Sequence, residues 1–458
     1  MRFARTAVST EEDTPKVKAR SLGAKVEVRS DGEGLVSHAG AFLLTGLADR
    51  LGLAQGLSEA MAPTRERRSA HDPGAVLRDL AVAIADGGDC VTDLAVLRGQ
   101  AELFGPVASE TTAHRVLRSA GGECLQRIRT ARARAREAAW AAGARPGELI
   151  IDIDATLLTS HSEKELAAGN YKRGYGFHPL LAYLGAEPLA AMLRPGNAGS
   201  NTAADHFGVL QSALEQIPEA DLEREITVRT DGGGATCAFL ADCRDAQINF
   251  SVGYELTPAL REALLDLPGS AWQAAVEPSG EPREGAWVAE LTDCIDLPSW
   301  PERTRLICRR ERAHPGAQMT FTDHEGHRFT ALLTDTEGEI ACLELRHRRR
   351  ARVEDAIRCG KETGMRNLPF HDFALNEAWV ELSLIAQELL AWAGALCLDG
   401  ALARAEPKRV RQRLLHVAGR IARSGRRVVL RLPRSWPWAQ ALVAAFEQLR
   451  ALPAPAPP

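Results

Sequence analysis

Three acidic positions that lie far apart in the chain have the residue types needed to hold divalent cations. Asp152 and Asp154 alternate within the apolar run LIIDIDAT, so a strand there points both carboxylates to one face of a sheet. Asp231 follows a second apolar run, EITVRT, at the kind of strand end where α/β sheets bind ligands. Glu354 from a later helix would complete a carboxylate cluster, which is costly unless cations neutralise it.

Oxygen ligands of this kind favour Mg²⁺ or Mn²⁺. Two such ions can activate a water or a 3′-hydroxyl and stabilise the leaving oxygen of a phosphodiester. The three acids therefore indicate metal-dependent phosphodiester chemistry that needs no side-chain nucleophile.

Residues 346–361, RHRRRARVEDAIRCGK, carry a matching set of charges. If this stretch is helical, its i, i+4, i+7 and i+11 positions share one face and are occupied by Arg350, Glu354, Ile357 and Lys361. The acid can hold a metal while the two cations hold a phosphate backbone. Arg350 and Glu354 also form an ordinary i,i+4 pair, so for this stretch alone a solvated, salt-bridged helix is the alternative.

The elements after Pro146 predict an α/β fold with a mixed sheet. The runs LIIDIDAT, HPLLAYLG and PLAAMLRPG are expected strands, and residues 202–217 an amphipathic helix. EITVRTD, ATCAFLADCRDA and INFSVGYE then predict strand, helix and strand. This order is typical of an α/β core, the first part of which we assign to residues 146–254.

Residues 255–338 break this rhythm and predict a β-rich insertion. Alternating patterns occur at TRLICRRE, QMTFTD and RFTALLTD, and the last two are expected to form a hairpin around residues 324–327. The core resumes over 339–400 with the charged helix and a long apolar helix from Asp372. Its tryptophans are expected in the core.

Helices are predicted on both flanks of this core. Residues 1–35 are charged with little periodicity and are expected to be disordered. Residues 36–145 predict a helical DNA-binding domain, in which Pro73 starts one helix and Gly87–Gly88 end it. Ser109 is expected to cap ETTAHRVLRSA, which resembles the reading helix of a helix-turn-helix unit, although a plain helical bundle fits equally well. Residues 401–458 predict a basic helical tail.

Overall composition excludes several classes of protein. The net charge is −4, so the whole chain is not a basic nucleic-acid binder. Arginines nevertheless cluster at residues 127–136, 346–352 and 404–434, and such patches are compatible with a polyanionic partner. We expect no membrane span and no signal peptide, and the nine scattered cysteines fit reduced thiols in a cytosol. The histidines lack ligand spacing, and no GxxxxGK[ST] nucleotide motif is present.

The order of acids on the first strand, the fourth strand and a helix after a β insertion resembles the RNase H-like core of bacterial DDE transposases. One insertion-sequence superfamily has a late signature of Tyr, two residues, Arg, three residues, Glu, six residues, Lys. Those positions are occupied here by His347, Arg350, Glu354 and Lys361. The runs LRPGNAGSN, VRTDGGG and RRRARVEDAIRCGKETGMRNLP are similar to the group typified by insertion sequence 1380. The resemblance extends from about residue 38 to about residue 440.

This resemblance implies a metal-binding triad of Asp154, Asp231 and Glu354 with two Mg²⁺ or Mn²⁺ ions. Asp154 is chosen over Asp152 because the family pattern places the acid two residues before a threonine. Arg350, Lys361 and the His347 position would contact DNA phosphate. The implied partners are terminal inverted repeats and target double-stranded DNA, handled by a homodimer or higher synaptic complex in the bacterial cytoplasm, associated with the nucleoid and without a membrane.

Two other readings remain open from sequence. DIDATL also fits the first motif of haloacid-dehalogenase-type phosphatases, in which Asp152 would be a nucleophile and Asp154 an acid/base. That reading does not account for the stripe from Arg350 to Lys361. The second alternative is a catalytically inactive, transposase-derived DNA-binding protein.

Overall fold

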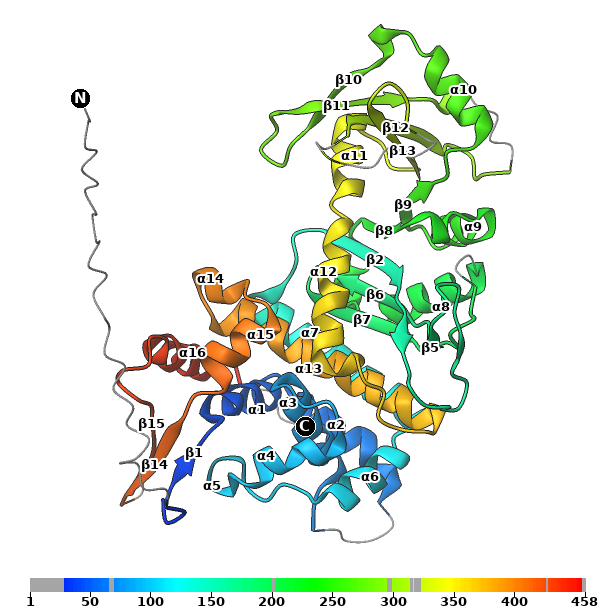
Figure 1. Ribbon diagram of the computed structural model, residues 1–458. Helices are drawn as coiled ribbons and strands as arrows, with labels where there is room; N and C mark the ends of the chain where they lie inside the picture. The colour runs from blue at the N-terminus through cyan, green and yellow to red at the C-terminus, as the bar shows by residue number, and fades with distance from the viewer. Residues whose placement is uncertain are drawn as a thin grey trace, which may run out of the picture.

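The computed structural model describes residues 29–65, 70–199, 202–294, 299–313, 316, 323–425 and 427–454. Within these residues the central feature is a nine-stranded mixed sheet in the order β10-β11-β12-β13-β9-β8-β2-β6-β7 (Figure 1). The bounds of its strands are β2 Leu149–Ala155, β6 Leu180–Leu184, β7 Glu187–Met192, β8 Ile226–Thr230, β9 Asn249–Tyr254, β10 Gln273–Val276, β11 Pro282–Glu290, β12 Arg305–Arg312 and β13 His327–Thr334.

The first five long strands form the predicted α/β core. β2 pairs parallel with β8, and β8 pairs parallel with β9, whereas β6 is antiparallel to both β2 and β7. Helices α8 (Ala203–Leu214) and α9 (Cys237–Asp245) share an apolar core with one face of this sheet. Helices α12 (Ala351–Gly360) and α13 (Phe373–Cys397) pack on the opposite face. Within this sheet the predicted order of three strands, helix, strand, helix, strand is confirmed, while the short strands β3 (Leu158–Thr159), β4 (Ala168–Gly169) and β5 (Tyr175–Phe177) between β2 and β6 form a separate sheet.

Alternation along β2 decides which side chains reach which layer. Ile151 and Ile153 are fully buried in the core beneath α8 and α9. Because successive strand residues point to opposite faces, Asp152 and Asp154 face α12. The sequence thus directs both acids to one side of the sheet.

The insertion continues the core sheet. β13 pairs antiparallel with β9, and β12 pairs with β13 over its full length. Helix α10 (Pro258–Asp266) covers the same face as α8 and α9, and α11 (Ile340–Arg348) packs on the other. β13 matches the expected strand, but the first strand of the expected hairpin falls at residues 318–323, of which 318–322 lie outside the described residues.

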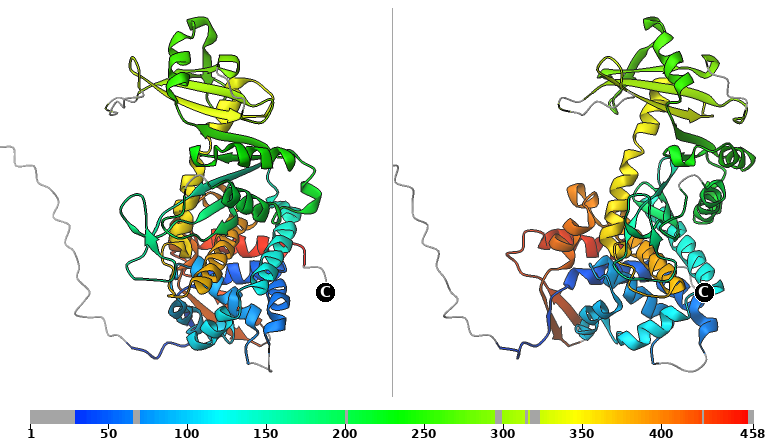
Figure 2. Two further views of the ribbon diagram at one scale, coloured as in Figure 1. Left: turned by 90° about the vertical axis from the view of Figure 1, so that its right-hand side faces the viewer. Right: turned by 45° about the vertical axis from the view of Figure 1, so that its right-hand side comes forward.

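The charged stretch 346–361 is not one continuous helix as expected. It divides into α11 and α12 at Arg349–Arg350, whose backbones stay close to helical, so the two helices follow one line (Figure 2). A π-helical turn, Lys361–Met365, follows α12. Its backbone leaves the helical conformation at Gly364, whose φ is 84°. The residues from Glu354 onward still share the predicted helix face, because the interruption at Arg349–Arg350 lies before Glu354.

A bundle of helices forms the N-terminal part. Its bounds are α1 Phe42–Arg50, α2 Leu53–Met61, α3 Pro73–Ala85, α4 Ala95–Arg98, α5 Ala101–Phe104, α6 Glu110–Arg118 and α7 Glu123–Ala139. The expected caps are confirmed: α3 starts at Pro73, and the Ser109 side chain accepts a hydrogen bond from Thr112 N at the start of α6. A DNA-reading role for α6 stays a prediction.

The C-terminal region is not the purely helical tail that was expected. Short helices α14 (Gly400–Ala403) and α15 (Pro407–Val410) precede a hairpin of β14 (Gly419–Ser424) and β15 (Arg427–Arg431), and α16 (Ala439–Ala451) follows. β14 also pairs with β1 (Leu35–Val36), so the last residue of the segment expected to be disordered, Leu35, lies in a strand, while most of that segment lies outside the described residues. The hairpin turns at Gly425, which has a φ of 57°, and Ile421 of β14 lies opposite Leu430 of β15.

The long helix α13 connects these parts. It meets the length and hydropathy criteria for a membrane-spanning helix, contrary to the sequence expectation, but 83% of the relevant window is buried. Trp379 and Trp392 are fully buried, as predicted, in an apolar core that also contains the N-terminal helices and the C-terminal elements. The burial is that of a core helix.

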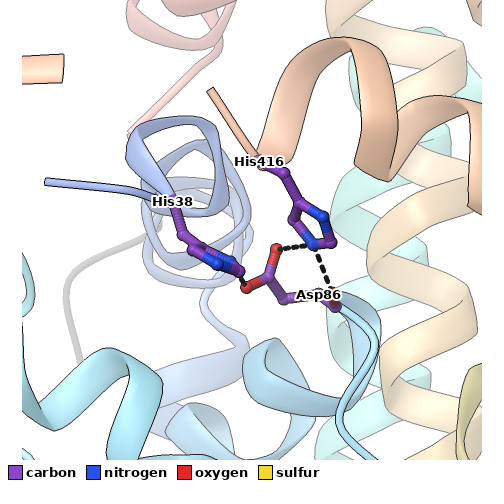
Figure 3. A group of neighbouring side chains, drawn as sticks. All are labelled: His38, Asp86 and His416. Atoms are coloured by element: carbon purple, nitrogen blue, oxygen red, sulfur yellow. Dashed lines mark hydrogen bonds and ion pairs between the residues drawn. The ribbon is translucent and has the colours of Figure 1, made fainter. Parts of the chain in front are cut away.

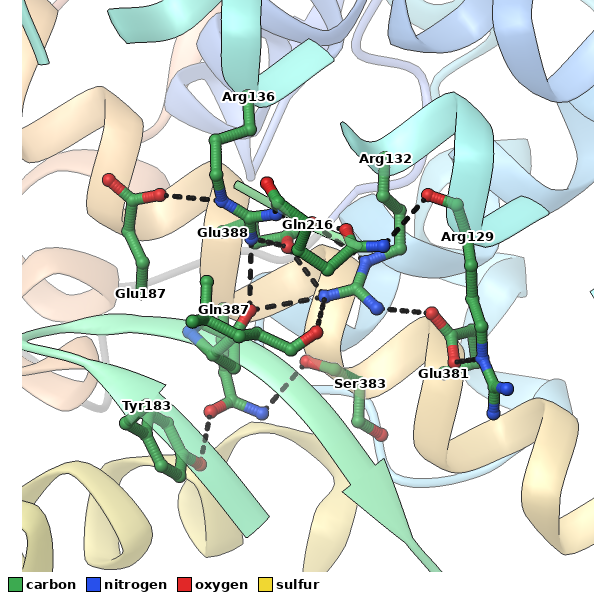
Figure 4. Close-up of polar contacts among 12 residues, drawn as sticks. Arg129, Arg132, Arg136, Tyr183, Glu187, Gln216, Glu381, Ser383, Gln387 and Glu388 are labelled. Atoms are coloured by element: carbon green, nitrogen blue, oxygen red, sulfur yellow. Dashed lines mark hydrogen bonds and ion pairs between the residues drawn. The ribbon is translucent and has the colours of Figure 1, made fainter. Parts of the chain in front are cut away.

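A buried ion network joins α7 to α13 (Figure 4). Arg132 donates to both oxygens of Glu388 at 3.1 and 2.6 Å, and Arg136 also pairs with Glu388. Arg132 pairs in addition with Glu381. Because Arg132 and Arg136 are at most 1% exposed, these two arginines of the cluster at 127–136 are not available to a polyanion, which corrects part of that expectation, whereas Arg134 is exposed.

We expect Glu388→Ala to destabilise the protein by about 3–5 kcal/mol, because it leaves two buried guanidiniums without their shared partner. The matched control is Glu59→Ala, which removes an exposed 3.6 Å pair with Arg134 and should cost at most about 1 kcal/mol. Urea denaturation followed by circular dichroism measures both. Equal losses for the two variants would show that the network does not stabilise the fold.

Candidate active site

The structure brings the three predicted acids to one end of the sheet. β2 and β8 run parallel with Ile153 opposite Thr230, so Asp154 and Asp231 are the next residues on neighbouring strands. Glu354 lies in the first turn of α12, which packs over this face. The charges of Asp231 and Glu354 both act on the Asp154 carboxyl, so the three side chains lie within electrostatic range of one another.

Each acid keeps oxygen atoms that are not committed to strong partners. Asp154 Oδ1 accepts from Ala155 N at 2.9 Å, and its Oδ2 lies 3.3 Å from Arg350 Nη1. Asp231 is exposed, and one of its oxygens accepts from Gly233 N at 2.8 Å. Glu354 is exposed and forms no hydrogen bond or ion pair with any residue that the structure describes.

Burial and like charges disfavour the ionised form of Asp154. Burial is the largest cause, and Asp231 and Glu354 add to it, while Arg350 opposes them. The net result raises the pKa of Asp154 from its ordinary value of 3.8 to about 6. A carboxyl in this state gains from any added cation, which is the property expected of a metal ligand.

Asp152 has a different environment from Asp154. Arg229 Nε and Nη2 donate to its two oxygens, both at 2.7 Å, and the pair is buried. A carboxylate held on both oxygens is not free to attack a phosphate, so this geometry does not support the phosphatase reading. The sequence reasoning missed Arg229, although its place opposite Asp152 follows from the parallel register of β2 and β8.

Lys361 and His347 are both partly buried. Lys361 Nζ donates to Leu157 O at 3.0 Å, which ties the end of α12 to the loop after β2, and burial lowers its pKa. His347 Nδ1 is 2.9 Å from Ser251 Oγ on β9. Burial, reinforced by neighbouring arginines, lowers the pKa of His347 to about 3, so it is neutral at physiological pH. A phosphate contact by either residue stays a prediction.

A glycine on β9 permits the close approach of the Asp231 turn. A Cβ at Gly253 would lie 3.0 Å from Gly232 N and 3.2 Å from Asp231 C, tighter than ordinary van der Waals contact. Any larger residue there would push the turn, and with it the carboxylate, away from the sheet.

The donor set fits a hard divalent cation. All three acids offer carboxylate oxygens, and the residues grouped at this site include neither cysteine nor a charged histidine. Arg350 supplies the positive charge that such a cluster requires when no ion is bound.

We expect Asp154→Asn to raise the melting temperature of the metal-free protein at about pH 8 and to raise it by less at about pH 5. A raised pKa means that the folded state loses stability as pH rises from the ordinary value of 3.8 towards about 6, and asparagine removes that loss. Differential scanning fluorimetry in a chelator measures this. Asp355→Asn, one residue after Glu354 and exposed, is the control and should show no such pH dependence. An unchanged or lower melting temperature for Asp154→Asn at the higher pH would contradict the assignment.

Comparison with known proteins agrees with the geometry of this site. A family model described as transposase DDE domain group 1 matches residues 18–454. No curated protein gives a significant match. The resemblance to DDE transposases is thereby confirmed, whereas membership of the insertion sequence 1380 group stays a prediction. Because the match covers nearly the whole chain and includes all three acids, this protein belongs to the DDE transposase family.

Proposed function

We propose that this protein cleaves DNA strands at the ends of an insertion sequence and joins the freed 3′-hydroxyl to target DNA, using Asp154, Asp231 and Glu354 as metal ligands. The observation that carries this proposal is the convergence of the three carboxylates at one end of the sheet, where burial, reinforced by Asp231 and Glu354, raises the pKa of Asp154 to about 6. The core strands β2, β6, β7, β8 and β9 and their helices are compatible with an RNase H-like fold, which we include in the proposal.

The roles of the residues follow from their surroundings. Two Mg²⁺ or Mn²⁺ ions at this site would supply activation of the attacking hydroxyl and stabilisation of the leaving oxygen. Arg350, which pairs with Asp154 in this structure, would be released by added cations to contact phosphate. Lys361 holds the loop after β2 and places a second cation beside the scissile strand. The Arg229 pair with Asp152 keeps the first strand of the site rigid.

DNA is the substrate that the family implies, and the exposed charges support a place for it. Four arginines of the β14–β15 hairpin are exposed: Arg420, Arg423, Arg427 and Arg431. We propose terminal inverted repeats and target DNA as partners, a homodimer or larger complex as the active form, and the bacterial cytoplasm as the location. The nine cysteines are all free, which is compatible with a reducing compartment.

We expect Asp231→Asn and Glu354→Gln each to reduce cleavage of inverted-repeat DNA by about 10³-fold or more, while DNA binding changes little. Each change removes a negatively charged ligand but keeps the size of the side chain. The assay incubates the DNA that flanks the gene with the protein and Mg²⁺ or Mn²⁺, and a gel-shift experiment reports binding.

Asp355→Asn is the matched control, since this exposed acid is adjacent to Glu354 and pairs with Arg358 at 3.0 Å. It should retain normal cleavage. Cleavage at the normal rate by Glu354→Gln would refute the triad. Wild-type protein that binds the repeats without cutting them would instead favour the inactive DNA-binding reading, and turnover of p-nitrophenyl phosphate would favour the phosphatase.

A further inference from the structure

A second cluster of ligand-type side chains contains none of the three acids and is formed by His38, Asp86 and His416 (Figure 3). His38 precedes α1, Asp86 ends α3, and His416 lies just before β14. His38 Nδ1 is 2.5 Å from Asp86 Oδ2, and His416 Nε2 is 3.2 Å from Asp86 Oδ1. One atom from each residue lies within 4.8 Å of the other two.

The Asp86 carboxylate is buried without a full set of partners. The residue is 5% exposed, and its Oδ1 receives no hydrogen bond in the described structure. His416 Nε2 is directed instead to the backbone O of Asp86, at 2.7 Å. The neighbouring guanidinium of Arg411 donates elsewhere, to Ala85 O, Glu362 O and Thr363 Oγ1. Among the described residues, this buried carboxylate between two imidazoles thus has no direct ion pair with an arginine.

We propose that His38, Asp86 and His416 form a structural zinc site. Two imidazole nitrogens and one carboxylate oxygen are ligands that Zn²⁺ commonly takes, unlike the all-oxygen set at the three acids. Ligand atoms about 2.0–2.1 Å from zinc in a tetrahedral arrangement lie roughly 3.3 Å apart, so small side-chain rotations accommodate the ion. The His416 side chain is 40% exposed, which leaves an open side for water as the fourth ligand.

The three ligands come from segments that lie far apart in the sequence. His38 follows β1, and His416 is shortly before β14, the strand that pairs with β1. An ion here would hold the start of the helical bundle, the end of α3 and the base of the β14–β15 hairpin together. Its role is to fix the exposed arginines of that hairpin relative to the bundle, and it takes no part in the chemistry at the three acids.

The test uses the full chain with Asp231→Asn and Glu354→Gln, so that the acid cluster contributes little binding. Equilibrium dialysis against Zn²⁺ with elemental analysis measures the bound metal, and thermal melting measures its effect on stability. We expect one equivalent of zinc and a higher melting temperature in its presence. His416→Gln and His38→Gln should each lose that equivalent and the stabilisation, while His371→Gln, which removes an exposed histidine elsewhere, should keep both.

The competing interpretation is a metal-free hydrogen-bonded triad. It predicts that the parent protein retains no zinc, or that His416→Gln and His38→Gln bind as much zinc as the parent, and either result overturns the proposal. Circular dichroism of His416→Gln checks its folding, which the exposed position of this side chain favours.

Discussion

Repulsion between like charges is the constraint on which the rest of this structure depends. Asp152, Asp154, Asp231 and Glu354 all lie at one end of the sheet, on the side covered by α12. In a partly buried place, neighbouring carboxylates raise each other's pKa unless positive charge is brought close. Two arginines meet this need: Arg229 from β8 binds Asp152, and Arg350 at the start of α12 binds Asp154. The two pairs are unequal, and the weaker one at 3.3 Å leaves Asp154 poised for a cation.

The insertion helps to position the third acid, Glu354. Its strands extend the core sheet, and α11 packs on its apolar face through Ile340, Ala341 and Leu343. α12 continues the line of α11 onto the core, where Val353 and Ile357 pack against Leu181 and Tyr183 of β6. Glu354 lies between these two anchor residues in sequence and is exposed at the side of the helix, next to the packed face. The position of the carboxylate therefore depends on both halves of the sheet.

The helical bundle is joined to this core by more than apolar packing. α13 contributes to the core of the bundle and, through Leu384, to the face of the sheet that carries α12. Arg132 and Arg136 reach from α7 to Glu381 and Glu388 on α13 and to Glu187 at the start of β7. Buried ion pairs demand defined geometry, because any misalignment leaves an uncompensated charge. DNA bound by the N-terminal helical bundle or by the β14–β15 hairpin would thus be held at a defined place relative to the three acids.

Much of this arrangement was readable in the sequence because it depends on local periodicity. Alternation in LIIDIDAT determined that both acids of β2 face one way, and helix spacing put Arg350, Glu354 and Lys361 on one stripe. Pro73 and Ser109 determined helix starts through their capping chemistry. The order of the core strands and helices also followed from sequence, whereas the choice of Asp154, Asp231 and Glu354 rested on the family resemblance and stays a prediction.

Tertiary structure alone decided which charges meet, since partners far apart in sequence leave no periodic signal. It paired Asp152 with Arg229, buried Arg132 and Arg136 of α7, and turned part of the basic tail into a hairpin paired with β1. His38, Asp86 and His416 show this most clearly, because no spacing rule relates them. Periodicity determines which face of its own helix or strand a side chain occupies. Which other element packs against that face depends on long-range packing of the whole chain.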